Sequence, residues 1–227
     1  MKFKDIVIRY GFATLGLCLV AMGIVLSVEA NCGISVLNAP GYAISAKTGM
    51  PLGFTCFAFF MLCVVFQWII LGKRFQVIDL LQVAANSVLG FMIDFFTFLF
   101  EALAFTPGSI WGVVLFIGLS IVFQAFGISM EVVSQAWMLP SDMTVRAIGM
   151  AWGGKFSDNK IKMDCTILVI AILLCLIFFG NIFGPKDQPI IGWGTLILAI
   201  TIGLFMKIST PAVRRIPYFK NSAEIKN

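Results

Sequence analysis

Residues 9–28, RYGFATLGLCLVAMGIVLSV, are almost entirely apolar after the initial arginine. A run of this length is long enough for an α-helix to cross the hydrocarbon core of a bilayer, which is about 30 Å thick. Five later stretches have a similar character, and none shows the two-residue alternation of a membrane β-strand. Because only helices and closed barrels satisfy their backbone in lipid, the sequence predicts an all-α membrane protein with six transmembrane helices. The predicted spans are 9–28, 52–71, 77–104, 109–130, 164–184 and 190–208.

The composition supports a membrane location and argues against several functions. Of the 227 residues, 60% are hydrophobic and 12% are charged, which is about half the charge of a soluble domain. The chain has no histidine, no nucleotide-binding glycine loop and no serine-hydrolase elbow. Its six cysteines form no Cys-x-x-Cys pair and lie mostly in apolar runs, as small buried hydrophobic residues do. We therefore expect no enzyme activity, no catalytic residue, no metal site and no cofactor.

Positive charges are distributed unevenly between the two sides of the predicted membrane region. If the N-terminus is cytoplasmic, Lys47 and Lys186 alone lie outside, and the other 14 of the 16 lysines and arginines lie inside. The positive-inside rule then predicts that both termini are cytoplasmic. Topology thus explains the net charge of +5, and we expect no nucleic-acid partner. Residues 211–227 are predicted to form a basic cytoplasmic tail that lies along anionic headgroups.

The second half of the chain repeats the pattern of the first. Met22-Gly23-Ile24 aligns with Phe126-Gly127-Ile128 at an offset of 104 residues, and residues 90–94 align with 203–207 at an offset of 113. Because each copy holds three spans, an odd number, the second copy is inverted in the bilayer. The sequence therefore predicts two inverted three-helix repeats, residues 1–105 and 106–210, followed by the tail.

Each repeat also contains a short segment after its first span, residues 33–48 and 137–153. Both segments are too short to cross a membrane. Asn38 before a proline, and Pro140 followed closely by Asp142, are typical of helix starts. Two interpretations remain open: interfacial surface helices, or re-entrant half-helices that enter from opposite sides with their N-termini inside the protein. The second interpretation implies a cavity, because irregular backbone at membrane depth must be buried in protein or line water.

One face of the third span is polar, since polar and small residues recur there at intervals of three or four. Buried amides need partners, so Gln82 and Asn86 either hydrogen-bond neighbouring helices or line a substrate path. Asp94 is either an interfacial carboxylate or a coupling site for H⁺ or Na⁺. This polar face consists of Asp79, Gln82, Asn86, Gly90, Asp94, Thr97 and Glu101.

The remaining charged candidates lie at the ends of spans. Glu29 and Glu131 lie at the ends of the first and fourth spans. Each is either a charge at the membrane boundary or a residue that takes part in gating or ion coupling. Arg146 follows Asp142 by four residues, so we expect an ion pair on one helix face, with binding of a substrate anion as the alternative. The candidate solute-binding residues are Asn38, Gln82, Asn86, Asp142 and Arg146, and the candidate coupling or gating residues are Glu29, Asp94 and Glu131.

Several glycine motifs resemble those of the bacterial YczE/YyaS/YitT-type integral membrane proteins. They are Leu-x-x-x-x-Met-Gly-Ile-x-Leu at 17–26, Ala-x-x-Gly at 30–33, Thr-Gly-x-x-x-Gly at 48–53 and Gly-Phe-Met-Ile-Asp at 90–94. The family's Ser-Pro-x-Asp-like turn survives in the second repeat as Pro140 and Asp142, whereas the first repeat has Val36 and Asn38. The resemblance covers nearly the whole chain. It implies a multi-pass protein of the bacterial cytoplasmic (inner) membrane with a transport role.

Three functions fit these observations. The first is a small secondary transporter whose two repeats rock about a midplane site, coupled to H⁺ or Na⁺. Because helix N-termini favour anionic groups, its expected solute is a small polar or anionic organic molecule. The second is a substrate-binding membrane subunit that works with an ATPase module, and the third is a non-transporting assembly or regulatory factor. The expected partners are a small solute and the lipid bilayer, and a homodimer is compatible with the sequence.

Overall fold

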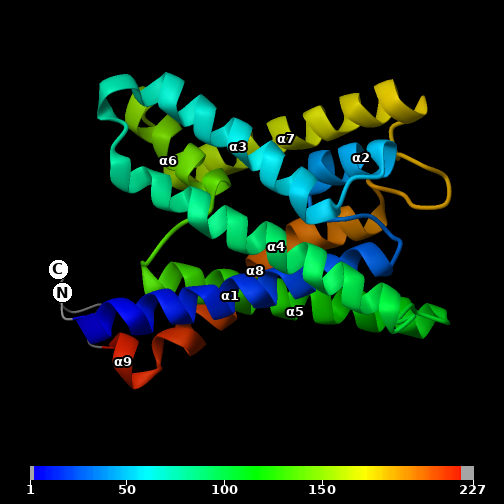
Figure 1. Ribbon diagram of the computed structural model, residues 1–227, viewed down its shortest axis with the longest axis horizontal. Helices are drawn as coiled ribbons and strands as arrows, with labels where there is room; N and C mark the ends of the chain where they lie inside the picture. The colour runs from blue at the N-terminus through cyan, green and yellow to red at the C-terminus, as the bar shows by residue number, and fades with distance from the viewer. Residues whose placement is uncertain (1–2, 221–227) are drawn as a thin grey trace.

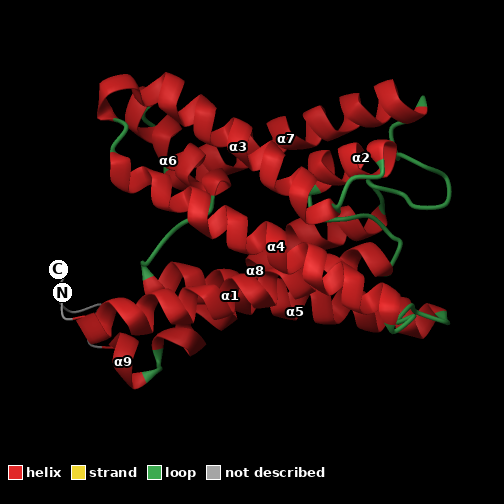
Figure 2. Ribbon diagram, in the orientation of Figure 1, coloured by secondary structure: helices red, strands yellow, loops and turns green. Residues whose placement is uncertain are grey.

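The computed structural model describes residues 3–220, and in that range the secondary structure consists of helices joined by loops, with no strands (Figure 2). Six helices are long and apolar enough to cross a membrane, which confirms the predicted number of spans. The long helices are α1 (Phe3–Glu29), α3 (Leu52–Leu71), α4 (Leu81–Ala102), α5 (Ile110–Ser134), α7 (Phe156–Phe179) and α8 (Trp193–Arg214). The short elements are α2 (Ala39–Thr48), α6 (Pro140–Trp152), α9 (Pro217–Lys220) and the 3₁₀ turns η1 (Gly72–Arg74) and η2 (Val77–Leu80).

One predicted boundary is wrong by two turns of helix. Residues 164–184 were expected to form the fifth span, whereas α7 begins at Phe156 and ends at Phe179. The polar residues at its start are helical because Lys160 pairs with Asp164 one turn later and with Asp142 of α6. The helix ends at Gly180, whose φ of 70° is in the left-handed region that favours glycine.

The core of the bundle is the contact between α1 and α5, which run side by side in opposite directions (Figure 1). Their backbones touch at Gly16 and Gly127: a Cβ on Gly127 would lie 2.5 Å from the Gly16 carbonyl oxygen. Two turns along, a Cβ on Gly23 would lie 2.9 Å from the Ser120 carbonyl oxygen. Small residues allow such close approach, which drives helix association in lipid.

Replacing Gly127 with leucine is therefore expected to destabilise the protein by about 3 kcal/mol, because the new side chain has to push the two backbones apart. Gly118 lies on the same helix with open space around its Cβ position. Gly118→Leu is the matched control and should change stability little. Thermal unfolding of both variants in detergent checks the prediction, and equal stability of the two would contradict it.

The other long helices pack around this pair in matching combinations. α1 contacts α4, and α5 contacts α8. α2 packs on α3 and α7, and α6 packs on the same two helices. α3 also packs on α4, but no comparable contact joins α7 and α8 in the described part of the chain. α4 likewise contacts α6, whereas α8 makes no comparable contact with α2 in the described residues. The two halves therefore make corresponding contacts except at these two helix pairs.

The two short helices lie toward opposite ends of the long ones (Figure 1). We call the end where α1 begins the amino-terminal end, and the other the opposite end. α6 lies toward the amino-terminal end and α2 toward the opposite end. In both, the first turn is buried, whereas Thr48 and Trp152 in the last turns are exposed. Each short helix thus has its N-terminus inside the protein.

The segment expected to be a tail is partly structured. α8 continues through Pro211 to Arg214, so the predicted start of the tail lies inside a helix. α9 then docks on α1, where the Tyr218 hydroxyl donates to the Asp5 carboxylate at 2.7 Å and Phe219 packs on Phe12. Residues 221–227 lie outside the described residues.

Candidate functional site

A cavity of about 400 Å³ lies at the amino-terminal end of the bundle. Its walls come from the start of α4, the end of α5, the linker that follows α5, and α6. Gln82, Glu131 and Arg146, three of the residues singled out from the sequence, line it together. The structure thus joins residues that lie up to 64 positions apart in the chain.

Two side chains in this cavity carry polar atoms without a partner. Glu131 is only 6% exposed, and its Oε1 accepts no hydrogen bond from the described residues. The indole Nε1–H of Trp137 is likewise buried without an acceptor. Tyr10 packs edge-on against the Trp137 ring, with centroids 5.1 Å apart. Unpaired buried polar groups are costly and rare, and here an unpaired acceptor and an unpaired donor both belong to residues that line the cavity. This makes the cavity the candidate site.

The inner wall of the cavity is held by a network of buried amides. Gln67 and Gln82 exchange two hydrogen bonds of 3.0 and 2.8 Å between α3 and α4. Gln67 also donates to the Pro140 carbonyl and the Thr144 hydroxyl of α6, each at 2.9 Å. This network fixes α6 against α3 and α4, and so sets the shape of the cavity.

Arg146 and Asp142 do not form the expected ion pair. The Asp142 carboxylate instead accepts from Lys160 of α7 at 2.9 Å, and Lys160 lies 3.6 Å from Asp164. Lys160 reaches Asp142 because α7 begins two turns earlier than predicted. Arg146 is consequently left exposed at the cavity, with its guanidinium available there.

Asn38 and Asn86 are buried outside the cavity. The Asn38 amide donates to the Ser35 hydroxyl at 2.8 Å, and its side chain does not cap α2. Asn86 donates to the Phe57 carbonyl at 3.0 Å, which is a hydrogen bond between α4 and α3. The carbonyl oxygen of each amide lacks a partner. The residues that lead into α2 pack on apolar side chains of α3 and α7.

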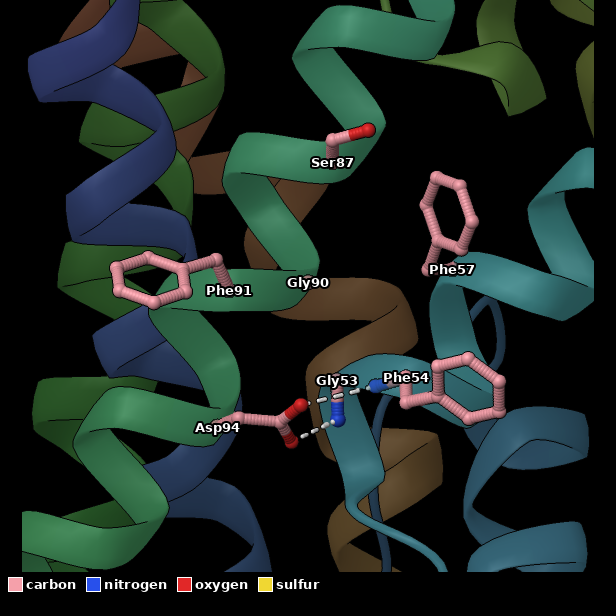
Figure 3. Close-up of a pocket in the computed structure, with 7 residues that line it drawn as sticks. All are labelled: Gly53, Phe54, Phe57, Ser87, Gly90, Phe91 and Asp94. Carbon is pink, nitrogen blue, oxygen red and sulfur yellow. Dashed lines mark hydrogen bonds between the residues drawn. The ribbon is translucent and has the colours of Figure 1, made fainter.

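Asp94 binds the N-terminus of the neighbouring helix. Its two carboxylate oxygens accept from the backbone N–H groups of Gly53 and Phe54 in the first turn of α3, at 2.5 and 3.1 Å (Figure 3). This bonding satisfies N–H groups that a helix start leaves free and is favoured by the helix dipole. A groove of about 210 Å³ runs beside it between α3 and α4, with Phe54 and Phe91 on its rim (Figure 3). Both Asp94 oxygens are engaged, so this groove offers a ligand less than the cavity does.

Glu29 lies half-buried at the opposite end, near Tyr42 of α2. Burial of the Tyr42 phenol, and to a smaller extent the negative charge of Glu29, raise the pKa of Tyr42 to about 12. The Tyr42 hydroxyl therefore remains protonated at neutral pH. It lies 3.4 Å from the side-chain oxygen of Gln188.

At this opposite end two segments are in direct backbone contact. Residues 31–34 after α1 meet residues 190–195 before and in α8, and we call this the closed contact. The Gly194 N–H donates to the Cys32 carbonyl at 2.8 Å, and the Ile34 N–H donates to the Ile190 carbonyl at 3.1 Å. Gly33 leaves no room for a side chain, since its Cβ would lie 2.5 Å from the Thr195 hydroxyl.

Several of the residues that build the site were not candidates from the sequence. Gln67 is a single amide in an otherwise apolar span, and that isolation was a usable signal, because a lone amide in lipid needs a partner. Thr144 has no such signal, since its role depends on how α6 packs. Trp137 does have one, because it flanks the second short segment, where an aromatic residue either anchors the chain at the interface or walls a site. Gly33 lies in a motif of the family resemblance, but its contact with residues 190–195 is a tertiary feature.

Together these features define a polytopic α-helical membrane protein with a polar cavity at one end. The chain belongs to a family described as a family of unknown function (DUF6198), whose model matches residues 7–211. The uncharacterized membrane protein YczE of Bacillus subtilis (strain 168) is 27% identical over 209 residues, which cover 92% of this chain and 88% of YczE. No solved structure matches the chain. The expected resemblance to the YczE-type proteins is confirmed.

Proposed function

We propose that this protein is a secondary transporter that moves a small polar solute by alternating access. The observation that carries the proposal is the difference between its two ends. A cavity is present at the amino-terminal end, while the opposite end holds the closed contact. A transporter resting with one side open has this form.

The proposal includes an inverted repeat, which the α1–α5 contact supports. By the sequence offset of 104, Gly16 corresponds to Ser120 and Gly23 corresponds to Gly127. When the two halves are exchanged, the contact Gly16–Gly127 therefore maps onto the contact Gly23–Ser120, and the reverse also holds. This exchange is what a two-fold axis through an antiparallel helix pair requires. The matching contacts of α2 and α6 with α3 and α7 agree with it.

The same offsets relate the closed contact to the cavity. Residues 31–34 correspond to 135–138, and 192–195 correspond to 79–82 by the offset of 113. Both of these equivalent segments line the cavity. Equivalent segments are therefore in contact at one end and separated by the cavity at the other. Exchanging the two arrangements would close the cavity and open the opposite end.

We further propose that the amino-terminal end faces the cytoplasm of a bacterial cell, as the lysine and arginine distribution predicts. The cavity would then open inward, with Gln82, Glu131 and Arg146 in contact with the solute. The roles of Asp94 and Glu29 in coupling remain predictions, and Asp94 has the additional structural role of binding the start of α3.

A disulfide across the cavity tests the proposal. Cys32 and Gly194, which share a hydrogen bond in the closed contact, correspond to Ala136 and Leu81. Leu81→Cys/Ala136→Cys, with the native cysteines other than Cys32 replaced by alanine, should form a disulfide in liposomes under mild oxidation. Cys32 should then react with a membrane-impermeant maleimide at least about tenfold faster, because the population shifts to the state open at the opposite end.

Two controls make the result decisive. Leu81→Cys alone should leave Cys32 labelling unchanged under the same oxidation. Reduction of the disulfide should restore the original labelling rate. Formation of the disulfide without faster labelling of Cys32 would show that the two ends are not coupled, and no disulfide would show that the cavity does not close. Either result would contradict alternating access.

A further inference from the structure

We propose that the cavity selects solutes carrying an ammonium group, which binds the carboxylate of Glu131. The inference rests on the proposed function in taking the cavity as the solute site, and it names the chemical class of that solute. It also changes the anionic preference expected from the half-helices alone.

The charges around the cavity favour a cation inside it. Asp79 and Arg146 carry opposite charges, and Asp79 already accepts from the Gln76 N–H at 2.8 Å. The remaining lining charge is Glu131, which is 6% exposed with Oε1 unpaired. Arg9 of α1 donates to the Ser134 carbonyl at 3.2 Å and is not among the residues that line the cavity. A buried carboxylate is stabilised most by a hydrogen-bonded cation.

The start of α6 offers little to an anion. The N–H groups of Asp142 and Met143 both donate to the Leu139 carbonyl at 3.1 Å, and Pro140 has no N–H. A side-chain carboxylate, Asp142, already occupies the first turn. That carboxylate is itself paired with Lys160, so it is the engagement of these N–H groups that leaves an anion little to bind at this helix start.

The other walls fit an organic cation better than a bare metal ion. Val132, Met138 and Met143 line the cavity, and thioethers and an indole suit methylene groups and ammonium groups. Residues 3–220 contain no cluster of three or more acidic, cysteine or histidine side chains that could hold a metal ion. The free Trp137 N–H adds a donor for an oxygen on the solute. The predicted ligand is thus a small amine with an oxygen acceptor, such as an amino alcohol.

Three probes of equal length separate the charge of the ligand from its size: 4-amino-1-butanol, 1,4-butanediol and 4-hydroxybutyrate. With purified wild-type protein in detergent, 4-amino-1-butanol at ten times its dissociation constant should raise the midpoint of thermal unfolding by about 3 °C. The diol and the hydroxy acid should leave the midpoint unchanged. Sodium chloride against potassium chloride, at equal ionic strength, tests for a metal cation at the same carboxylate.

Three variants assign the effect to the cavity. Glu131→Gln keeps the shape and should weaken amine binding by about tenfold or more. Glu101→Gln removes an exposed carboxylate at the opposite end of α4 and should bind as wild type. Trp137→Phe keeps an aromatic ring without the N–H, and should weaken 4-amino-1-butanol binding but not n-butylamine binding.

Several outcomes would overturn the inference. They are stronger stabilisation by 4-hydroxybutyrate than by the amine, no response to the amine, unchanged amine binding by Glu131→Gln, or an equal Glu131-dependent response to sodium. The proposed function can fail separately. If the amine binds but is not taken up into liposomes and the two ends are not coupled, transport is disproved while the ligand class still stands. Coupled ends without amine binding would disprove the ligand class alone.

Discussion

Replacing Gly33 with valine is expected to open the opposite end of the protein and to raise the maleimide labelling rate of Cys32 by about tenfold or more. Gly33 has a φ of +103°, and its Cβ would lie 2.5 Å from the Thr195 hydroxyl oxygen and 2.6 Å from the Gly192 nitrogen. A branched side chain therefore cannot be accommodated while residues 31–34 touch residues 190–195. The closed contact loses stability, and the state in which it is separated gains population.

The experiment uses a variant that retains Cys32 as its single cysteine, reconstituted in liposomes and treated with an impermeant maleimide. Gly49→Val is the matched control, because Gly49 also has a positive φ, of +73°, but no atom lies within 4 Å of its Cβ position. That control introduces backbone strain without a collision. Equal labelling rates in the two variants would mean that strain, not separation of the closed contact, exposes Cys32. The proposed role of Gly33 would then be wrong.

Replacing Gln67 with leucine should destabilise the protein by about 2–3 kcal/mol, because its loss leaves a buried amide without partners. Gln82 is 2% exposed and makes its two hydrogen bonds with Gln67. The Pro140 carbonyl is affected less, since the Thr144 hydroxyl still donates to it at 2.7 Å. The measurement is the free energy of unfolding in detergent.

The double variant Gln67→Leu/Gln82→Leu is the informative control. Replacing both partners with apolar groups of similar size removes the unpaired amide, so stability should return to near the wild-type value. Binding of the solute should be weaker than in the wild type, because the double variant lacks the Gln82 amide that lines the cavity. A double variant as unstable as the sum of both single variants would show that the two amides do not form a network.

The spans were predictable because length and hydrophobicity alone decide which helices can cross lipid. The start of α7 was not, because Lys160 is helical there only through partners on α6 and on its own next turn. The repeat offsets were visible as glycine positions, and they predict which segments correspond at the two ends. A short sequence motif shows where a glycine lies in the chain, but it does not show which other segment's backbone that glycine contacts in the fold.

The polar residues of the candidate site were predictable from the sequence, but which of them come together in one cavity was not. Gln82, Glu131 and Arg146 were candidates and share the cavity, whereas Asn38, Asn86 and Asp142 have partners elsewhere. Sequence spacing gives the face of a helix on which a residue lies. Whether that face meets a cavity or another helix depends on the crossing of distant segments, as for Trp137 and Tyr10.

The bonding of Asp94 to the start of α3 has a thermodynamic consequence for the whole molecule. Lys207 is the equivalent residue in α8 by the offset of 113, and an ammonium group cannot accept hydrogen bonds from N–H groups. Gly203, the equivalent of Gly90, has open space where Gly90 touches Gly53. In the first half α3 and α4 are thus held together by direct contacts, whereas in the second half the described parts of α7 and α8 lack the equivalent contacts. In the proposed transport cycle the inward-open and outward-open forms would therefore differ in free energy, and an unloaded molecule is expected to rest mainly in one of them.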